Sequence, residues 1–131
     1  MKNILVVDDE KVWIKDFQHI FRNYSVTAYQ DFYKALKFVK TRKMDLYLVD
    51  MKPVRGFTEK NKELLTEKER EILALPEEIF YAVREKGWEE GFYFISNHQS
   101  PHDEEVLART GAKFVSKSEY QELERICKTL S

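Results

Sequence analysis

The sequence is poor in several features that define other classes of protein. It contains one cysteine, Cys127, so an internal disulfide bond is impossible and a reducing, cytoplasmic location is expected. Its apolar runs are far shorter than the ~20 residues that cross a bilayer, and the run Ile4–Val7 meets two acids too soon for a signal peptide. With 22 Lys+Arg against 23 Asp+Glu, the chain lacks the basic field of a general nucleic-acid binder. We therefore expect no direct contact with nucleic acid or membrane.

What is present is sufficient for one domain. The chain has 131 residues, of which 43% are hydrophobic, so a single domain spanning 1–131 with a real core is expected. One part departs from this pattern, because Thr58 to Glu71 contains only two apolar residues, Leu64 and Leu65. We expect 56–91 to be an extended helical segment within the domain. Its charged part is either a solvated helix with alternating charge or a partner-docking element or lid.

Short runs rich in β-branched and aromatic residues alternate with segments of helical periodicity. The five runs expected to be strands are 3–7, 25–29, 46–49, 92–95 and 113–116. In the segment after the first run, Trp13, Phe17 and Ile20 fall on one face of a helix. Strands that alternate with helices predict a parallel sheet with right-handed crossovers. Five such units predict an α/β, flavodoxin-like doubly wound fold with strand order 2-1-3-4-5.

Helix boundaries have local signals as well. Asp31 is placed to cap the helix that follows it, and Pro76 is placed at the first position of another helix. Ser100 and Pro101 form a similar start, while Gly87 and Gly111 are expected to end helices. These signals divide the chain into the expected helices independently of the apolar pattern.

Polar residues stand where four of the expected strands end. Asp8 and Asp9 follow the first strand, Asp50 follows the third, Ser96 the fourth and Lys117 the fifth. Doubly wound sheets bind ligands beyond the carboxyl ends of their strands, so the three aspartates should converge. Adjacent carboxylates repel one another unless a lysine or a hard cation such as Mg²⁺ neutralises them. Such a set can hold a phosphoryl group, and a carboxylate can itself be the nucleophile that accepts it.

Four segments at these strand ends carry a resemblance to a known family. They are Val6-Val7-Asp8-Asp9-Glu10, Leu48-Val49-Asp50-Met51, Phe94-Ile95-Ser96 and Gly111-Ala112-Lys113-Phe114-Val115-Ser116-Lys117. These segments resemble the signatures of a response-regulator receiver domain of two-component signalling, in a divergent member. The resemblance covers nearly the whole chain except the long segment after the third strand. It implies a phosphoprotein of signal transduction that uses Mg²⁺ as its cofactor.

The resemblance also implies a metal site. Asp9 would bind the magnesium ion directly and Asp8 would bind it through water. Asp50 and the backbone carbonyl of Lys52 would be the other protein ligands.

Further roles follow from the same resemblance. Asp50 would accept a phosphoryl group from a histidine kinase or a phosphotransfer protein, and Lys117 would pair with the phosphate or with Asp50. Ser96 would bind a phosphoryl oxygen and, together with Phe114, form the switch that moves on phosphorylation. No enzymatic activity is implied beyond self-phosphorylation and autodephosphorylation. Because the chain ends at Ser131 after the last expected helix, output through contact with an unknown protein is expected.

Several positions depart from the family pattern. The family usually has a proline after its conserved lysine, whereas Ser118 follows Lys117 here, and a trans bond is the default for serine. Pro53 and Gly56 come earlier than expected, which indicates a shortened loop after Asp50. The side chain of Lys52 adds an ammonium group beside the acids. It either weakens metal binding by repulsion or stabilises the empty or phosphorylated site.

Two other functions compete with the phospho-acceptor. The departures are also typical of a degenerate receiver that acts as a phosphorylation-independent interaction module. A phosphatase of the haloacid-dehalogenase type is a poorer match, because that family has a second aspartate two residues after its nucleophile, where this chain has Glu10 after Asp8. A transition-metal site at His98, His102 and Asp103 is less well supported than a structural role, because the three lie in a loop and first helical turn without a nearby cysteine.

Overall fold

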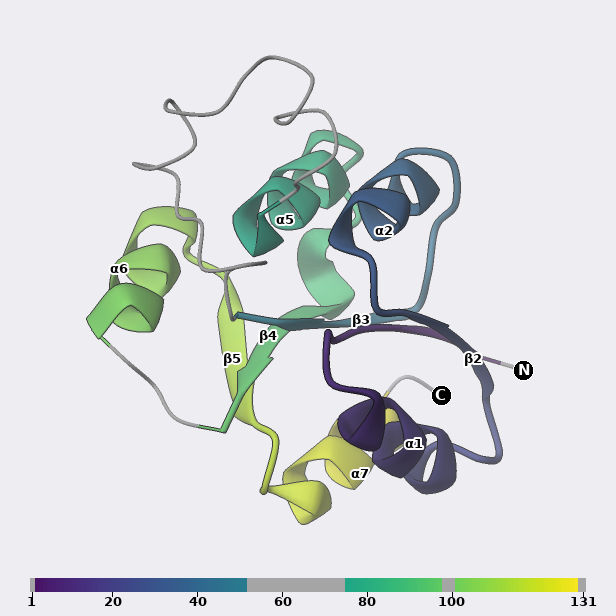
Figure 1. The fold of residues 1–131 in the computed structure, drawn as a ribbon. Coiled ribbons are helices and arrows are strands. Elements are labelled where there is room, and N and C mark those ends of the chain that lie inside the picture. The colour runs from purple at the N-terminus through teal and green to yellow at the C-terminus, as the bar shows by residue number, and fades with distance from the viewer. Residues whose placement is uncertain (1, 52–74, 98–100, 130–131) are drawn as a thin grey trace.

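A five-stranded parallel sheet forms the centre of the protein. The computed structural model describes residues 2–51, 75–97 and 101–129. Its strands are β1 (Asn3–Val7), β2 (Ser25–Tyr29), β3 (Leu46–Asp50), β4 (Phe92–Ser96) and β5 (Lys113–Ser116). They lie in the order β2-β1-β3-β4-β5, and every neighbouring pair is parallel (Figure 1). The predicted flavodoxin-like strand order is therefore confirmed.

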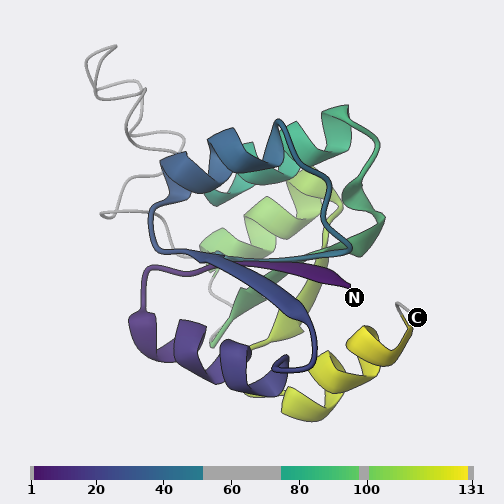
Figure 2. The same ribbon diagram turned by 90° about the vertical axis from the view of Figure 1, so that its right-hand side faces the viewer.

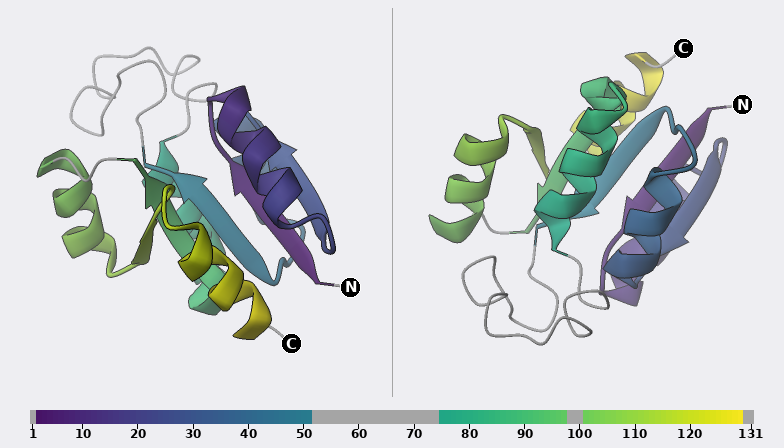
Figure 3. Two further views of the ribbon diagram at one scale, coloured as in Figure 1. Left: turned by 90° about the horizontal axis from the view of Figure 1, so that it is seen from below. Right: turned by 90° about the horizontal axis from the view of Figure 1, so that it is seen from above.

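Helices cover both faces of this sheet. They are α1 (Lys11–Ile20), α2 (Phe32–Val39), α5 (Pro76–Glu85), α6 (Pro101–Thr110) and α7 (Tyr120–Thr129), with a short 3₁₀ helix η2 (Glu89–Gly91) before β4. Helices α1 and α7 lie on one face, and α2, α5 and α6 lie on the other (Figures 2 and 3). Thr58 to Glu71 lies outside the described residues. Across the described ranges, no helix combines the length and apolar character that a membrane crossing requires.

Alternation along each strand divides the core between the two faces. In β1, Ile4 and Val6 pack with α1 and α7, whereas Leu5 and Val7 pack with α2 and α5. All four side chains have an exposed fraction of 0%. A strand that is buried on both faces has to be apolar throughout, which explains the uninterrupted run Ile4–Val7.

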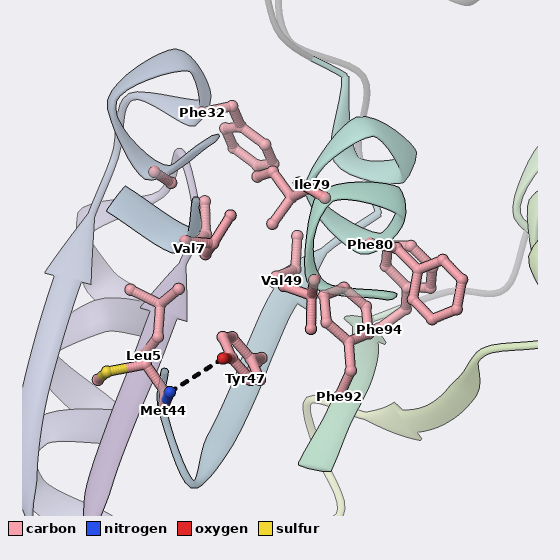
Figure 4. Close-up of a cluster of buried hydrophobic side chains, with 14 of the residues drawn as sticks. Leu5, Val7, Phe32, Met44, Tyr47, Val49, Ile79, Phe80, Phe92 and Phe94 are labelled. Carbon is pink, nitrogen blue, oxygen red and sulfur yellow. Dashed lines mark hydrogen bonds between the residues drawn. The ribbon is translucent and has the colours of Figure 1, made fainter. Parts of the chain in front are cut away.

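Aromatic side chains dominate the core beneath α5. The ring centroids of Phe92 and Phe94 are 4.9 Å apart, and those of Phe80 and Phe92 are 5.0 Å apart (Figure 4). In the same layer, the backbone N–H of Met44 donates a 2.9 Å hydrogen bond to the hydroxyl oxygen of the buried Tyr47. These contacts fix the third and fourth strands to each other and to α5, and so hold their carboxyl ends in place.

The local signals for helix ends agree with the structure. The Asp31 carboxylate accepts hydrogen bonds from the N–H groups of Tyr33 and Lys34 at the start of α2. Gly87 and Gly111 follow α5 and α6 with φ angles of +74° and +71°, a conformation that glycine adopts without strain.

The start of α5 and the end of α1 can also be compared with the sequence. Pro76 is the first residue of α5, as expected. The apolar stripe that begins at Trp13 continues past the end of α1, because Phe21 lies in the following turn and is still buried.

Gly91, the last residue of η2 before β4, lies very close to the backbone that leads into β3. A Cβ atom at this position would lie 2.2 Å from the backbone oxygen of Asp45, which is far inside van der Waals contact. We expect Gly91→Ala to lower the free energy of unfolding by about 2 kcal/mol, because the backbone must move to make room. Gly87→Ala is the control, since a Cβ there meets open space and only the positive φ is strained. Urea unfolding of both variants measures the difference, and equal losses would contradict the close approach.

Candidate functional site

The structure brings acids and a lysine from three strands together at one edge of the sheet. Asp8 follows β1, Asp50 is the last residue of β3, and Lys117 follows β5. The Lys117 Nζ atom lies 2.7 Å from Oδ2 of Asp8 and 3.1 Å from Oδ1 of Asp50. All three side chains have an exposed fraction of 0%. The convergence expected from the strand ends is therefore present.

Parallel pairing explains why these residues meet. Val7 of β1 lies opposite Val49 of β3, so the residue that follows each of them reaches the same edge of the sheet. The backbone N–H of Asp8 donates a 3.1 Å hydrogen bond to the carbonyl of Tyr29, which continues the ladder from β1 to β2. Asp8 and Asp50 are thus placed by the backbone geometry of the sheet and not by a flexible loop.

The buried charges are not balanced. Lys117 carries one positive charge between two carboxylates, and burying a charge without full compensation is unfavourable. Burial, and next the neighbouring charge of Asp8, raise the pKa of Asp50 to about 7, although Lys117 acts in the opposite direction. Burial also raises the pKa of Asp8, against its hydrogen bonds with Lys117 and with the N–H of Glu10. Ionising both carboxylates therefore leaves these three buried groups with a net negative charge, which a proton or a cation would offset.

The acidic residues fit a divalent cation. Asp8, Asp9 and Asp50 each offer one carboxylate oxygen, and these atoms lie within 4.8 Å of one another. Within the described ranges, Oδ2 of the buried Asp50 has no hydrogen-bond partner. Asp9 is exposed, so the cluster opens to solvent on its side. Oxygen ligands of this kind suit a hard cation such as Mg²⁺.

Two sets of predicted features lie outside the described residues. One is the carbonyl ligand of Lys52 together with the ammonium group of that residue. The other is the shortened loop at Pro53 and Gly56.

Lys117 lies in a turn between two serines, Ser116 and Ser118, directly after β5. The backbone N–H of Lys117 donates a 3.0 Å hydrogen bond to the carbonyl of Ser96, which extends the pairing of β4 with β5. The hydroxyl oxygens of Ser116 and Ser118 are 2.9 Å apart, and the N–H of Glu119 donates to the carbonyl of Ser116. The bond between Lys117 and Ser118 is trans. Lys117 therefore reaches Asp8 and Asp50 without the proline that usually follows the conserved lysine in the family it resembles.

Ser96 lies at the end of β4 with a partner that the sequence does not indicate. Its hydroxyl donates a 3.4 Å hydrogen bond to Oδ2 of Asp103, in the first turn of α6. Both residues are buried, with exposed fractions of 4% and 6%. Asp103 is thus tied to the site through Ser96, while His98 lies outside the described residues. Within residues 2–51, 75–97 and 101–129, the cluster of Asp8, Asp9 and Asp50 is the single group of three or more His, Cys, Asp or Glu side chains that could hold a metal ion.

The two aromatic residues of interest lie on opposite faces of the sheet. Phe114 is half-buried in β5 and packs against the core beneath α5, where its predicted switch role stays a prediction. Trp13 of α1 is half-buried on the other face, as expected of a packing residue. Its ring centroid is also 5.2 Å from the Lys117 Nζ atom, a contact that helical periodicity does not reveal.

Comparison with known proteins supports the fold independently. No protein-family model matches the sequence, and no curated protein matches it significantly. Solved structures do match. The Vibrio cholerae chemotaxis protein CheY4 is 14% identical with a TM-score of 0.69, and the alignment covers 100% of this chain and 99% of that chain. A CheY-like response-regulator receiver domain from Methanospirillum hungatei is 20% identical with a TM-score of 0.69, and the coverage is 99% and 94%.

A third matching structure contains a bound metal ion. The receiver domain of a sensor histidine kinase from Pseudomonas aeruginosa is 19% identical with a TM-score of 0.71, and the alignment covers 98% of this chain and 96% of that chain. That structure has a magnesium ion coordinated in its active-site cleft. These three neighbours are a chemotaxis protein and two receiver domains, and the chain has their CheY-like fold.

The raised pKa of Asp50 predicts a pH-dependent effect of Asp50→Asn. Because this pKa rises from 3.8 to about 7, the folded protein holds a proton in that range that the unfolded chain has released. The stability that Asp50 contributes is therefore present below pH 3.8 and lost as the pH rises through about 7. Without divalent ions, we expect Asp50→Asn to raise the free energy of unfolding by about 2 kcal/mol at about pH 8 and by little at about pH 4. Urea unfolding across this range measures the effect, and equal gains at both ends would contradict it.

Magnesium should stabilise the folded protein through the acidic cluster. At about ten times its dissociation constant, we expect Mg²⁺ to raise the free energy of unfolding by about 1.4 kcal/mol, since it binds only the folded site. Asp9→Asn removes the exposed ligand and should weaken Mg²⁺ binding by about tenfold. Asp16→Asn, on α1 outside the cluster, is the control and should respond like the wild type. Unfolding at graded MgCl₂ concentrations distinguishes these cases, and an unchanged response of Asp9→Asn would exclude a metal site at this cluster.

Proposed function

We propose that the chain is a phospho-acceptor signalling domain in which Asp50 receives a phosphoryl group from a histidine kinase or a phosphotransfer protein. The observation that carries the proposal is the buried contact of Lys117 with both Asp8 and Asp50 at the carboxyl edge of a receiver-like sheet. A structural ion pair alone does not need a third carboxylate within reach, as Asp9 is here. The arrangement suits a site that alternates between carboxylate and acyl phosphate.

Asp50 is better placed than Asp8 to be the acceptor. Oδ1 of Asp8 accepts a 2.9 Å hydrogen bond from the N–H of Glu10, and Oδ2 of Asp8 makes the shorter contact with Lys117. Asp50 keeps one oxygen, Oδ2, that has no hydrogen-bond partner within the described ranges. This difference favours Asp50 as the nucleophile and disfavours a phosphatase of the haloacid-dehalogenase type, which would use Asp8.

The chemistry assigned to this chain is a nucleophilic displacement at phosphorus. A carboxylate oxygen of Asp50 forms a bond to phosphorus while the bond from phosphorus to the donor breaks. The leaving group, a histidine imidazole or acetate, takes the bonding electron pair. The Lys117 ammonium stabilises negative charge that develops on the phosphoryl oxygens. A magnesium ion held by Asp8, Asp9, Asp50 and the Lys52 carbonyl would supply further positive charge.

Signalling follows from what the phosphoryl group attracts. Ser96 is the proposed hydrogen-bond donor to a phosphoryl oxygen, and Phe114 on the adjacent strand is the proposed residue that moves with it. The signal is then a shift between two conformations of the face formed by α6 and β5, which an output protein reads. The chain acts on no separate substrate in this proposal. We place it in the cytoplasm, where the buried, free Cys127 stays reduced.

Acetyl phosphate tests the acceptor directly. Incubation with acetyl phosphate and MgCl₂ should give an acid-labile phosphate on the wild type and none on Asp50→Asn. Lys117→Met should slow labelling by about 10²-fold, because it removes the charge beside the reacting oxygens. Phosphate retention on acid-urea gels or intact mass measures the outcome. The control is Lys15→Met on α1, an exposed lysine whose loss should leave the labelling rate unchanged.

Failure of this experiment would favour one of two other functions. A protein that binds Mg²⁺ and stays unlabelled would favour the phosphorylation-independent interaction module. In that module, Asp50→Asn leaves partner binding unchanged. Steady turnover of a phosphomonoester that Asp8→Asn abolishes would instead favour the phosphatase.

A further inference from the structure

The ammonium group of Lys117 is surrounded on three sides. It has three N–H donors, and two carboxylate oxygens lie 2.7 Å and 3.1 Å from its nitrogen. On a further side, the ring centroid of Trp13 is 5.2 Å away, within the ~6 Å at which an ammonium is attracted to an aromatic face. No part of Lys117 is exposed to solvent. The indole ring is thus a partner of this charge as well as a packing residue.

Trp13 is itself held in a defined position. It lies in the first turn of α1, where its backbone N–H donates a 3.1 Å hydrogen bond to the carbonyl of Glu10. Its ring centroid is 6.3 Å from that of Phe17, whose side chain is fully buried. Because α1 begins directly after Asp8 and Asp9, one short stretch of backbone supplies both the acids and the aromatic face. The placement of the ring beside Lys117 therefore follows from the start of α1 and from its packing on Phe17.

Lys117 needs such a contact more than a lysine followed by proline would. Proline fixes its own φ angle and restricts the residue before it, whereas Ser118 imposes neither constraint. The lysine side chain has four rotatable bonds, so contacts at its end must set the position of the ammonium group. When Asp50 carries a phosphoryl group, its contact with the ammonium has to change. Asp8 and the Trp13 ring carry no phosphoryl group and can keep their places.

We propose that Trp13 is a positioning residue for phosphoryl transfer to Asp50, acting by holding the Lys117 ammonium against its indole face. This inference rests on the proposed function and deepens it. Trp13 touches neither the phosphoryl group nor the reacting oxygens in this account. It acts only through Lys117, so its effect on the reaction should disappear when the lysine is absent.

A double-mutant cycle tests this dependence. Trp13→Leu keeps an apolar side chain and removes the aromatic face, and it should slow labelling by acetyl phosphate about tenfold. Trp13→Phe keeps a smaller face and should lose only about twofold to threefold. In a Lys117→Met background, Trp13→Leu should cause no further loss. A role in packing alone would slow both backgrounds equally and would overturn the proposal. Trp88→Phe is the control for general effects of tryptophan loss, because Trp88 packs against the core on the other face of the sheet, and it should label at the wild-type rate.

A spectroscopic readout separates this inference from the proposed function. The ammonium protons of ¹⁵N-labelled Lys117 should be shifted upfield by the indole ring in NMR spectra and should exchange slowly with water. Trp13→Leu should lose the upfield shift, and Trp13→Phe should keep part of it. If the wild type shows the shift and is never labelled, the proposed function fails while the contact stands. If labelling proceeds and Trp13→Leu labels at the wild-type rate, the positioning role is refuted. The NMR comparison also holds if Lys117→Met fails to fold, because it uses only Trp13 variants.

Discussion

One buried ion pair, between the Lys117 ammonium and the carboxylates of Asp8 and Asp50, constrains the carboxyl edge of the sheet. Removing three charged groups from water is costly, and their mutual attraction repays this only if their geometry is well defined. Here the geometry comes from three strands whose ends cannot move independently, because each belongs to a continuous ladder. The sheet is therefore the support for a cluster of charges that would otherwise separate.

The two layers of helices contribute differently to this support. Helices α2 and α5 pack with β1, β3 and β4 through a core rich in aromatic rings, which fixes the strand ends from above in Figure 1. Helix α1 lies on the other face and adds Trp13 directly to the neighbourhood of Lys117. Helix α6 is joined to the strand ends by the contact between Ser96 and Asp103. Helices α1 and α6 thus each have a residue in contact with a site residue, whereas α2 and α5 act through the strands.

The strands and the meeting of the charged residues can be predicted from the sequence. The contacts that cannot be predicted all depend on how helices pack on the sheet. Strand positions and the convergence of Asp8, Asp50 and Lys117 follow from alternation and from the shared direction of parallel strands. The contact of Trp13 with Lys117 does not, because it depends on how α1 is rotated against the sheet, which periodicity leaves open within a turn. The burial of Asp103 likewise depends on how α6 docks. Contacts that arise from helix packing were missed, whereas those that arise from strand direction were predicted.

The start of α1 shares a carboxylate with the site. Glu10 precedes the helix without a side-chain cap of its own, and its N–H is instead bonded to Oδ1 of Asp8. The orphan N–H groups at a helix start attract negative charge, so Asp8 serves the helix and the lysine at once. Any species that draws electron density from this carboxylate also weakens its bond to the helix start. Fraying of the first turn of α1 is therefore thermodynamically linked to what binds the acidic cluster.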